Sequence, residues 1–225
     1  MAGVLLLVSL VAGGFGEGYV PAKLIVGSSA SATAGNLKAF DWLYRLGFAA
    51  YLVEASCDVA LAWIFYVLLR PVQKNVALLA AFFGLLSTAT FATCELFYVA
   101  PLRILGGSDF LKTFSPDQLN TLALLSLKIF GYGGMVFTAF YGVAWMIRGY
   151  LMFRSGYLPK FLGVLMGLGG LGFFVRNFLL VLAPDHAPGV LLFLMAPGGL
   201  VLTVWLLVKG VVGREQTPLI RKVRV

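Results

Sequence analysis

The stretch from Arg45 to Arg70 constrains the fold of this chain more than any other. Between the two arginines lie 24 mostly apolar residues, and about 20 such residues are enough for a helix to cross the hydrocarbon core of a bilayer. The whole chain shares this character, since its 225 residues are 60% hydrophobic and 12% charged, whereas soluble globular chains are roughly 25% charged. The sequence therefore predicts an integral membrane protein with a single all-α domain over residues 1–225.

Apolar segments of spanning length recur six times along the chain. Length and periodicity place them at residues 2–20, 45–69, 76–100, 120–148, 161–183 and 189–209. No lysine or arginine precedes the first segment, so it lacks the basic region of a cleaved secretory signal and we expect it to be retained as a span. The polar stretch between the first two spans predicts a loop or a short interfacial helix. We expect a bundle of six transmembrane helices.

The distribution of lysine and arginine predicts the orientation, because short basic connections resist translocation. Ten basic residues fall in the second and fourth connections and the tail: Arg70, Lys74, Arg148, Arg154, Lys160, Lys209, Arg214, Arg221, Lys222 and Arg224. The first, third and fifth connections are nearly neutral, so both termini are expected in the cytoplasm. The formal charge of +8 follows from these connections and does not indicate a nucleic-acid partner. The expected partners are membrane lipid and, in one interpretation, other membrane protein subunits.

Five charged side chains fall inside the predicted spans and away from the span ends, where each costs about 2.5–3.5 kcal/mol near the bilayer centre. They are Glu54, Asp58, Glu95, Lys128 and Arg176. The first two are four residues apart and share one helix face, and the helical rise places all five in the outer half of the membrane. We expect them to converge, with the two bases facing the three acids. Such a cluster either binds a small ligand or holds the helices together as buried ion pairs.

The sequence offers little for metal or covalent chemistry. Cys57 and Cys94 lie inside predicted spans without a CxxC motif, which indicates packing residues. His186 is the only histidine and falls in the fifth connection, where a solvated loop residue is expected. No metal site, cofactor or catalytic residue is therefore predicted.

Two glycine-rich segments each allow a packing interpretation. The GYGG segment from Gly131 to Gly134 indicates either an unwound helix exposed to a ligand or close helix packing. The segment from Gly163 to Gly167 fits the small-xxx-small rule for helix contact, and we expect that contact to be intramolecular.

Four segments that follow one another between residues 23 and 210 carry a family resemblance: KLIVGSSASATAGNLKAF, YRLGFAAYLVEASCDVALAWIFYVLLRPVQKNVALLAAF, GYLMFRSGYLPKFLGVLMGLGGLGF and TVWLLVKG. Together they resemble a bacterial membrane family catalogued as domain of unknown function 4386, and the phrase from Phe153 to Pro159 is the most specific. The resemblance implies six helices and a location in the bacterial plasma (inner) membrane. It implies no established activity.

Three functions remain open at this point. The favoured one is a non-enzymatic membrane protein that binds a small ligand in the charged cluster from the outer side, or serves as an accessory subunit of a membrane complex. The alternative is a secondary transporter or proton-coupled carrier in which Glu54 or Asp58 titrates. A third is an intramembrane enzyme that uses these carboxylates as acid and base.

Overall fold

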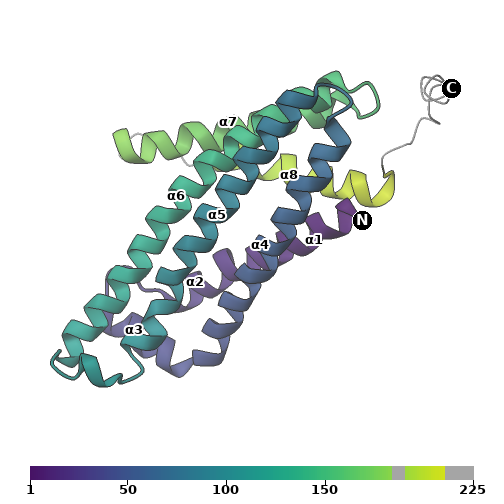
Figure 1. Ribbon diagram of the computed structural model, residues 1–225. Helices are drawn as coiled ribbons and strands as arrows, with labels where there is room; N and C mark the ends of the chain where they lie inside the picture. The colour runs from purple at the N-terminus through teal and green to yellow at the C-terminus, as the bar shows by residue number, and fades with distance from the viewer. Residues whose placement is uncertain (184–190, 211–225) are drawn as a thin grey trace.

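The computed structural model describes residues 1–183 and 191–210, and every regular element in that part of the chain is helical. The elements are α1 (Ala2–Gly13), a π-helical turn (Gly14–Tyr19), α2 (Val20–Leu24), α3 (Ala30–Ala39), α4 (Asp41–Leu69), α5 (Lys74–Ile104), a 3-10 turn (Asp109–Leu111), α6 (Pro116–Arg154), α7 (Lys160–Leu182) and α8 (Leu191–Val208), shown in Figure 1. The predicted fifth connection, with His186, and the basic tail after Lys209 lie outside the described residues.

Five helical stretches in the described residues are long and apolar enough to cross a membrane, which confirms an all-α, multi-pass membrane protein. They are Ala2–Leu24, α4, α5, α6 and α7. Helix α8 has 18 residues and occupies the sixth predicted segment. Helix α6 has 39 residues, which at 1.5 Å per residue is about 58 Å. It therefore extends well beyond a hydrocarbon core of about 30 Å.

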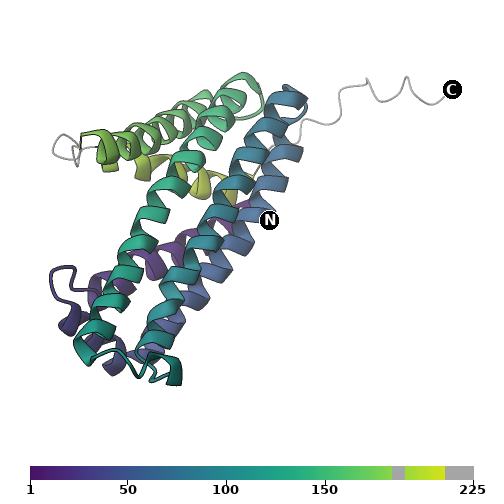
Figure 2. The ribbon, with the colours of Figure 1, turned by 60° about the vertical axis from the view of Figure 1, so that its left-hand side comes forward.

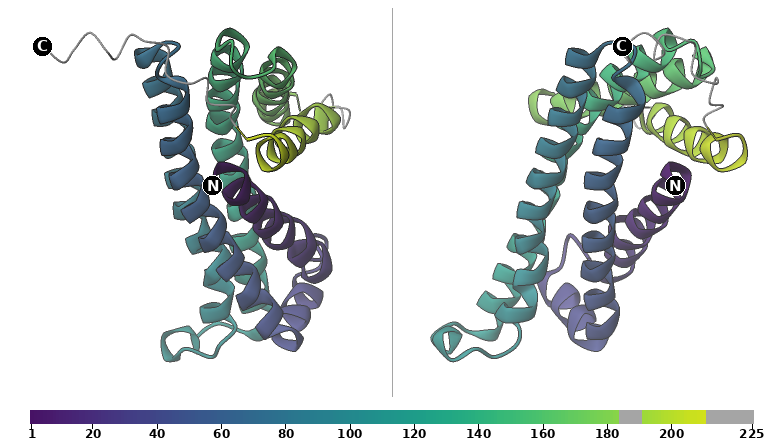
Figure 3. Two further views of the ribbon diagram at one scale, coloured as in Figure 1. Left: turned by 90° about the vertical axis from the view of Figure 1, so that its right-hand side faces the viewer. Right: turned by 45° about the vertical axis from the view of Figure 1, so that its right-hand side comes forward.

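The long helices form a closed ring. Contacts run from α1 to α4, then to α5, α6, α7 and α8, and α8 packs back against α1. Figures 1 and 2 show α4, α5 and α6 as three long neighbouring helices that α7 and α8 cross near one end. Figure 3 shows the start of α1 beside α8. We call the end with the connections 70–73 and 155–159 the hairpin end, and the end with α3 and residues 105–115 the α3 end.

Capping residues fix where the helices near the α3 end begin. The Ser115 hydroxyl accepts a hydrogen bond from the Gln118 amide at 3.3 Å, and the Gln118 side chain accepts one from the Ser115 amide at 2.8 Å. This reciprocal pair is a capping box and starts α6. Ser29 likewise accepts from the amide of Ala32 and starts α3, so the polar segment after the first span does contain a short helix.

Glycines bring α6 and α7 into backbone contact. A Cβ added to Gly149 would lie 2.6 Å from the carbonyl oxygen of Gly163, and Gly142 meets Gly170 in the same way. The predicted intramolecular packing role of the glycines from Gly163 is therefore confirmed. The GYGG segment remains within the continuous helix α6, so its interpretation as an unwound helix is wrong.

Two buried apolar clusters fill the ring. One lies toward the hairpin end and includes Phe65 and Leu151, and the other lies toward the α3 end and includes Tyr51 and Tyr98. Tyr141 packs against both clusters. Large apolar side chains also cover the outside of the helices, as a lipid-facing surface requires: Trp63, Phe82, Leu96, Phe178 and Val204 are all at least half exposed.

Candidate ligand-binding site

The five charged residues predicted from the sequence do not form ion pairs with one another. Two salt bridges occur among the described residues, Arg45 with Asp41 and Lys112 with Asp109, and both join exposed near neighbours in the chain. The structure instead places Lys128 at the surface, Asp58 at a small cavity, Arg176 at a large cavity, and Glu54 and Glu95 among the packed helices.

Lys128 lies apart from the acids. Its side chain is exposed, and its Nζ lies beside Gly27, between α2 and α3, where an added Cβ would approach it to 3.1 Å. The two glutamates point inward. Glu95 is 2% exposed and Glu54 lies against Gly13 of α1, where an added Cβ would come within 2.6 Å of its Oε1. Each keeps one buried carboxylate oxygen without a hydrogen-bond partner among the described residues.

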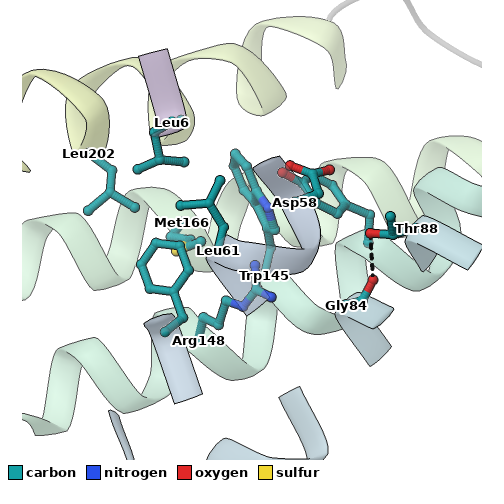
Figure 4. Close-up of a pocket in the computed structure, with 12 residues that line it drawn as sticks. Leu6, Asp58, Leu61, Gly84, Thr88, Trp145, Arg148, Met166 and Leu202 are labelled. Atoms are coloured by element: carbon teal, nitrogen blue, oxygen red, sulfur yellow. Dashed lines mark hydrogen bonds between the residues drawn. The ribbon is translucent and has the colours of Figure 1, made fainter. Parts of the chain in front are cut away.

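Asp58 faces a small cavity at the centre of the ring. Its Oδ1 accepts a hydrogen bond of 3.0 Å from the hydroxyl of Ser9 on α1. Figure 4 shows Asp58 and Arg148 reaching this cavity from α4 and α6, with Trp145 and Thr88 beside them. The cavity volume is about 10 Å³, which is about the space that one water molecule needs.

Arg148 is a buried base that we did not expect inside the helix bundle. We expected it in the fourth connection, but α6 continues to Arg154, and Arg148 is buried with 4% exposure. Its guanidinium lies 5.1 Å from the centre of the Phe65 ring, a cation–π distance. Gly84 makes room for it, because an added Cβ there would lie 2.6 Å from an Arg148 nitrogen. Arg148, and not Lys128 or Arg176, is therefore the base nearest Asp58.

Arg176 lines a larger cavity of about 490 Å³ that opens between the helices. Glu17, on the π-helical turn, lines the same cavity, and no salt bridge within 4 Å joins the two among the described residues. The remaining wall is mainly apolar and aromatic and comes from α2, α4, α5, α6 and α7: Pro21, Ile25, Tyr51, Phe91, Leu127, Phe130, Gly131, Gly134, Met135, Phe137, Thr138, Asn177 and Leu180. Two opposite charges therefore share one apolar cavity without contacting each other.

Polar atoms without partners line this cavity as well. Asn177 is 5% exposed, and its amide nitrogen donates to Thr138 Oγ1 and to the Phe173 carbonyl, both at 2.8 Å. Its Oδ1 and the hydroxyl of the fully buried Tyr51 have no hydrogen-bond partner among the described residues. Buried polar groups are almost always hydrogen-bonded, so these two atoms mark places where a bound molecule would supply the partner.

Glu17 is the site residue that sequence reasoning missed, because its place near the outer end of the first predicted span put it among the charges of the first connection. The helix continues through Glu17 to Leu24, and the intervening turn is π-helical, a deviation that is frequent at functional sites. Glu54, four residues before Asp58 on α4, lies against Gly13, which precedes Glu17 by four residues. The glycines on both sides of Glu17, in GFGEGY, were the available signal.

The comparisons with known proteins place this chain in a family. An uncharacterized protein from Archaeoglobus fulgidus is 28% identical to it over 153 residues, which is 68% of this chain and 76% of the relative. No solved structure matches. The model of the family described as domain of unknown function 4386 matches residues 1–210. The chain therefore belongs to this family.

Proposed function

We propose that this protein is a non-enzymatic membrane protein that binds a small amphipathic ligand in the large cavity. The observation that carries the proposal is the cavity itself, which holds Glu17 and Arg176 on an otherwise apolar wall. Ligand sites in proteins are typically clefts of about 300–1,000 Å³ with a few polar groups on an apolar lining. The 490 Å³ cavity has this size and character.

The proposed placement in the membrane puts this cavity in the outer half. We propose that α8 is the sixth span and that both termini are cytoplasmic, in the inner membrane of a bacterium. The hairpin end carries Arg70, Lys74, Arg154 and Lys160, as expected of a cytoplasmic end. The large cavity lies toward the other end, because Ile25 of the segment that follows α2 is part of its wall.

The open cavity favours ligand binding over the accessory-subunit alternative. An accessory subunit would need no cavity large enough for a ligand, and the small cavity of about 10 Å³ that Asp58 and Arg148 share fits that description. Glu17 and Arg176 line an open cavity. Association with other membrane subunits remains a second part of the proposal, for which the exposed apolar outer faces of the helices supply the surface.

A proton-coupled carrier is the second candidate, and one specific arrangement favours it. Asp58 accepts a hydrogen bond from Ser9, Glu54 lies against Gly13, and Glu17 at the large cavity follows Gly13 by four residues along the first span. Carboxyl groups in such a series form proton relays in membrane transporters. Glu54 is the middle member, so Glu54→Gln would abolish pH-dependent uptake if the chain is a carrier.

Co-purification tests the ligand-binding proposal. Gly134 lines the cavity and has open space where a side chain would begin, so Gly134→Leu should fill part of it. Gly35→Leu on the exposed surface of α3 is the matched control, because an added Cβ there also meets nothing within 4 Å. Extracts of the purified proteins are compared by mass spectrometry. A compound retained by the wild type and Gly35→Leu but lost from Gly134→Leu supports the proposal, and identical extracts from all three contradict it.

A further inference from the structure

We infer that the ligand of the large cavity is a lipid with a zwitterionic headgroup, whose ammonium and phosphate groups lie at Glu17 and Arg176 and whose hydrocarbon chain lies between α6 and α7. This inference rests on the proposed function and names its ligand class. It follows from the arrangement of charges in the cavity, from a second, apolar groove that adjoins it, and from the residues that the two share.

The charges of the cavity require a ligand of both signs. Glu17 and Arg176 line one apolar cavity from different helices without a salt bridge between them, and a charge in an apolar membrane environment is costly unless it is paired. The guanidinium of arginine binds phosphate in a bidentate manner. A carboxylate accepts the hydrogen bonds of an ammonium group. A molecule that carries phosphate and ammonium together satisfies both ends of the cavity at once.

Asn177 adds an acceptor at the same place. Because its amide nitrogen is already bound to Thr138 and to the Phe173 carbonyl, only its Oδ1 remains free for a ligand, and that atom is buried and without a partner. An acceptor needs a donor, which a primary ammonium supplies in three N–H bonds. The free hydroxyl of Tyr51 can donate to a phosphate or ester oxygen of the same headgroup.

The apolar groove provides room for the chain. It has a volume of about 580 Å³, lies between α6 and α7 with Phe83 of α5 at its edge, and has an almost entirely apolar wall. Its lining includes Met135 and Asn177, which also line the large cavity. Phe178 and Val181 in the groove are 50% and 70% exposed, so the groove faces the bilayer. A lipid can therefore place its headgroup in the cavity while its chain remains in apolar surroundings.

Native mass spectrometry of the purified full-length protein in a maltoside detergent tests this inference with three probes. Oleoyl lysophosphatidylethanolamine carries both charges and a chain, glycerophosphoethanolamine carries both charges without a chain, and oleoyl lysophosphatidate carries the chain without the ammonium. We expect the first probe to bind at least tenfold more tightly than the other two. Glu17→Gln should remove its preference over lysophosphatidate, and Arg176→Gln should weaken both chain-bearing probes about tenfold.

Two further variants test the position of the chain. Phe178→Asn places a polar group in the groove and should weaken the lysophosphatidylethanolamine probe several-fold, whereas Val204→Asn changes an equally exposed apolar site on α8 and should not. If the chainless zwitterion binds as tightly as the lipid, a free zwitterion is the ligand, and the inference fails while the proposed function stands. If no probe binds in a manner that depends on Glu17 or Arg176, the inference fails, and an unchanged extract from Gly134→Leu would then overturn the proposed function too.

Discussion

Asp58 and Arg148 reach one small cavity from helices α4 and α6, and the hydroxyl of Ser9 on α1 donates to Asp58 at 3.0 Å. Three helices of the ring therefore place polar groups near a single point within the apolar cluster toward the hairpin end. The acid is 8% exposed and the base 4% exposed, so each depends on the other for compensation of its charge. This relationship makes the centre of the ring sensitive to the loss of either partner.

Removing only the base should destabilise the protein strongly. Arg148→Met leaves Asp58 buried with no base at its cavity, and an uncompensated buried charge of this kind costs about 3–5 kcal/mol. The double variant with Asp58→Asn should recover most of that loss, because no buried charge remains. Unfolding in detergent measures the free energies. Arg154→Gln, on the exposed end of the same helix, is the control and should be neutral, and equal losses in all variants would disprove the coupling.

Two glycines one turn apart on α7 should respond in opposite ways to alanine. A Cβ at Gly163 would lie 2.6 Å from the Gly149 carbonyl oxygen, whereas a Cβ at Gly167 meets nothing within 4 Å. Gly163→Ala should therefore cost about 1–3 kcal/mol through overpacking, and Gly167→Ala should be neutral or slightly stabilising because alanine favours helix. Thermal unfolding of the two variants separates the effects. A neutral Gly163→Ala would show that α6 and α7 are not in backbone contact.

The hydrogen bond of the Tyr157 hydroxyl should make the free energy of unfolding depend on pH in the alkaline range. Its hydroxyl donates to the Leu68 carbonyl at 2.5 Å, and burial raises its pKa above the ordinary value of about 10. Because the folded state holds this proton more tightly than the unfolded state, its contribution is complete below pH 10 and declines as the pH rises toward the folded pKa. Tyr157→Phe should cost about 1 kcal/mol at pH 7.

The difference in unfolding free energy between the wild type and Tyr157→Phe should then shrink above pH 10. Tyr150→Phe, at an exposed tyrosine, serves as the control for general alkaline effects. A difference that stays constant between pH 7 and pH 11 would mean that the hydroxyl does not lose its hydrogen bond on ionisation.

Cysteine labelling should separate the two ends of the molecule. Phe110→Cys lies in the exposed segment of the α3 end and Gln73→Cys in the exposed hairpin connection. In a background with Cys57 and Cys94 replaced by alanine, an impermeant maleimide applied to intact cells should modify position 110 but reach position 73 only after permeabilisation. The reverse pattern would invert the proposed orientation and place the large cavity in the inner half.

The positions of the helices could be predicted from the sequence, but the arrangement of the charged side chains between them could not. Hydrophobic length located the spans because every backbone group in lipid must be paired within a helix. The positively charged Arg148 appeared to begin the fourth connection, whereas α6 continues to Arg154 and buries Arg148. Arg148 can be buried inside the helix bundle because Gly84 leaves space for its guanidinium and the ring of Phe65 packs against it. Neither contact produces a periodic pattern in the sequence.

The location of Glu17 was unpredictable for a related reason. Its distance along the chain placed it at the membrane boundary, but the π-helical turn carries the helix on to Leu24 and aligns Glu17 with the cavity. Arg176 lines the large, mainly apolar cavity. Which acid shares that cavity depends on how α7, α8 and α1 close the ring, and local sequence does not encode this closure.

Photo-methionine crosslinking tests the central claim most directly, because Met135 lines both the large cavity and the adjoining groove. The protein is produced with the photoreactive analogue, irradiated in nanodiscs that contain phosphatidylethanolamine, and digested for mass spectrometry. We predict a lipid adduct at position 135 that is lost in Arg176→Gln, and none at Met166, which is 2% exposed. An adduct at position 135 that is unchanged in Arg176→Gln, or no adduct there at all, would contradict a lipid held by the charged cavity.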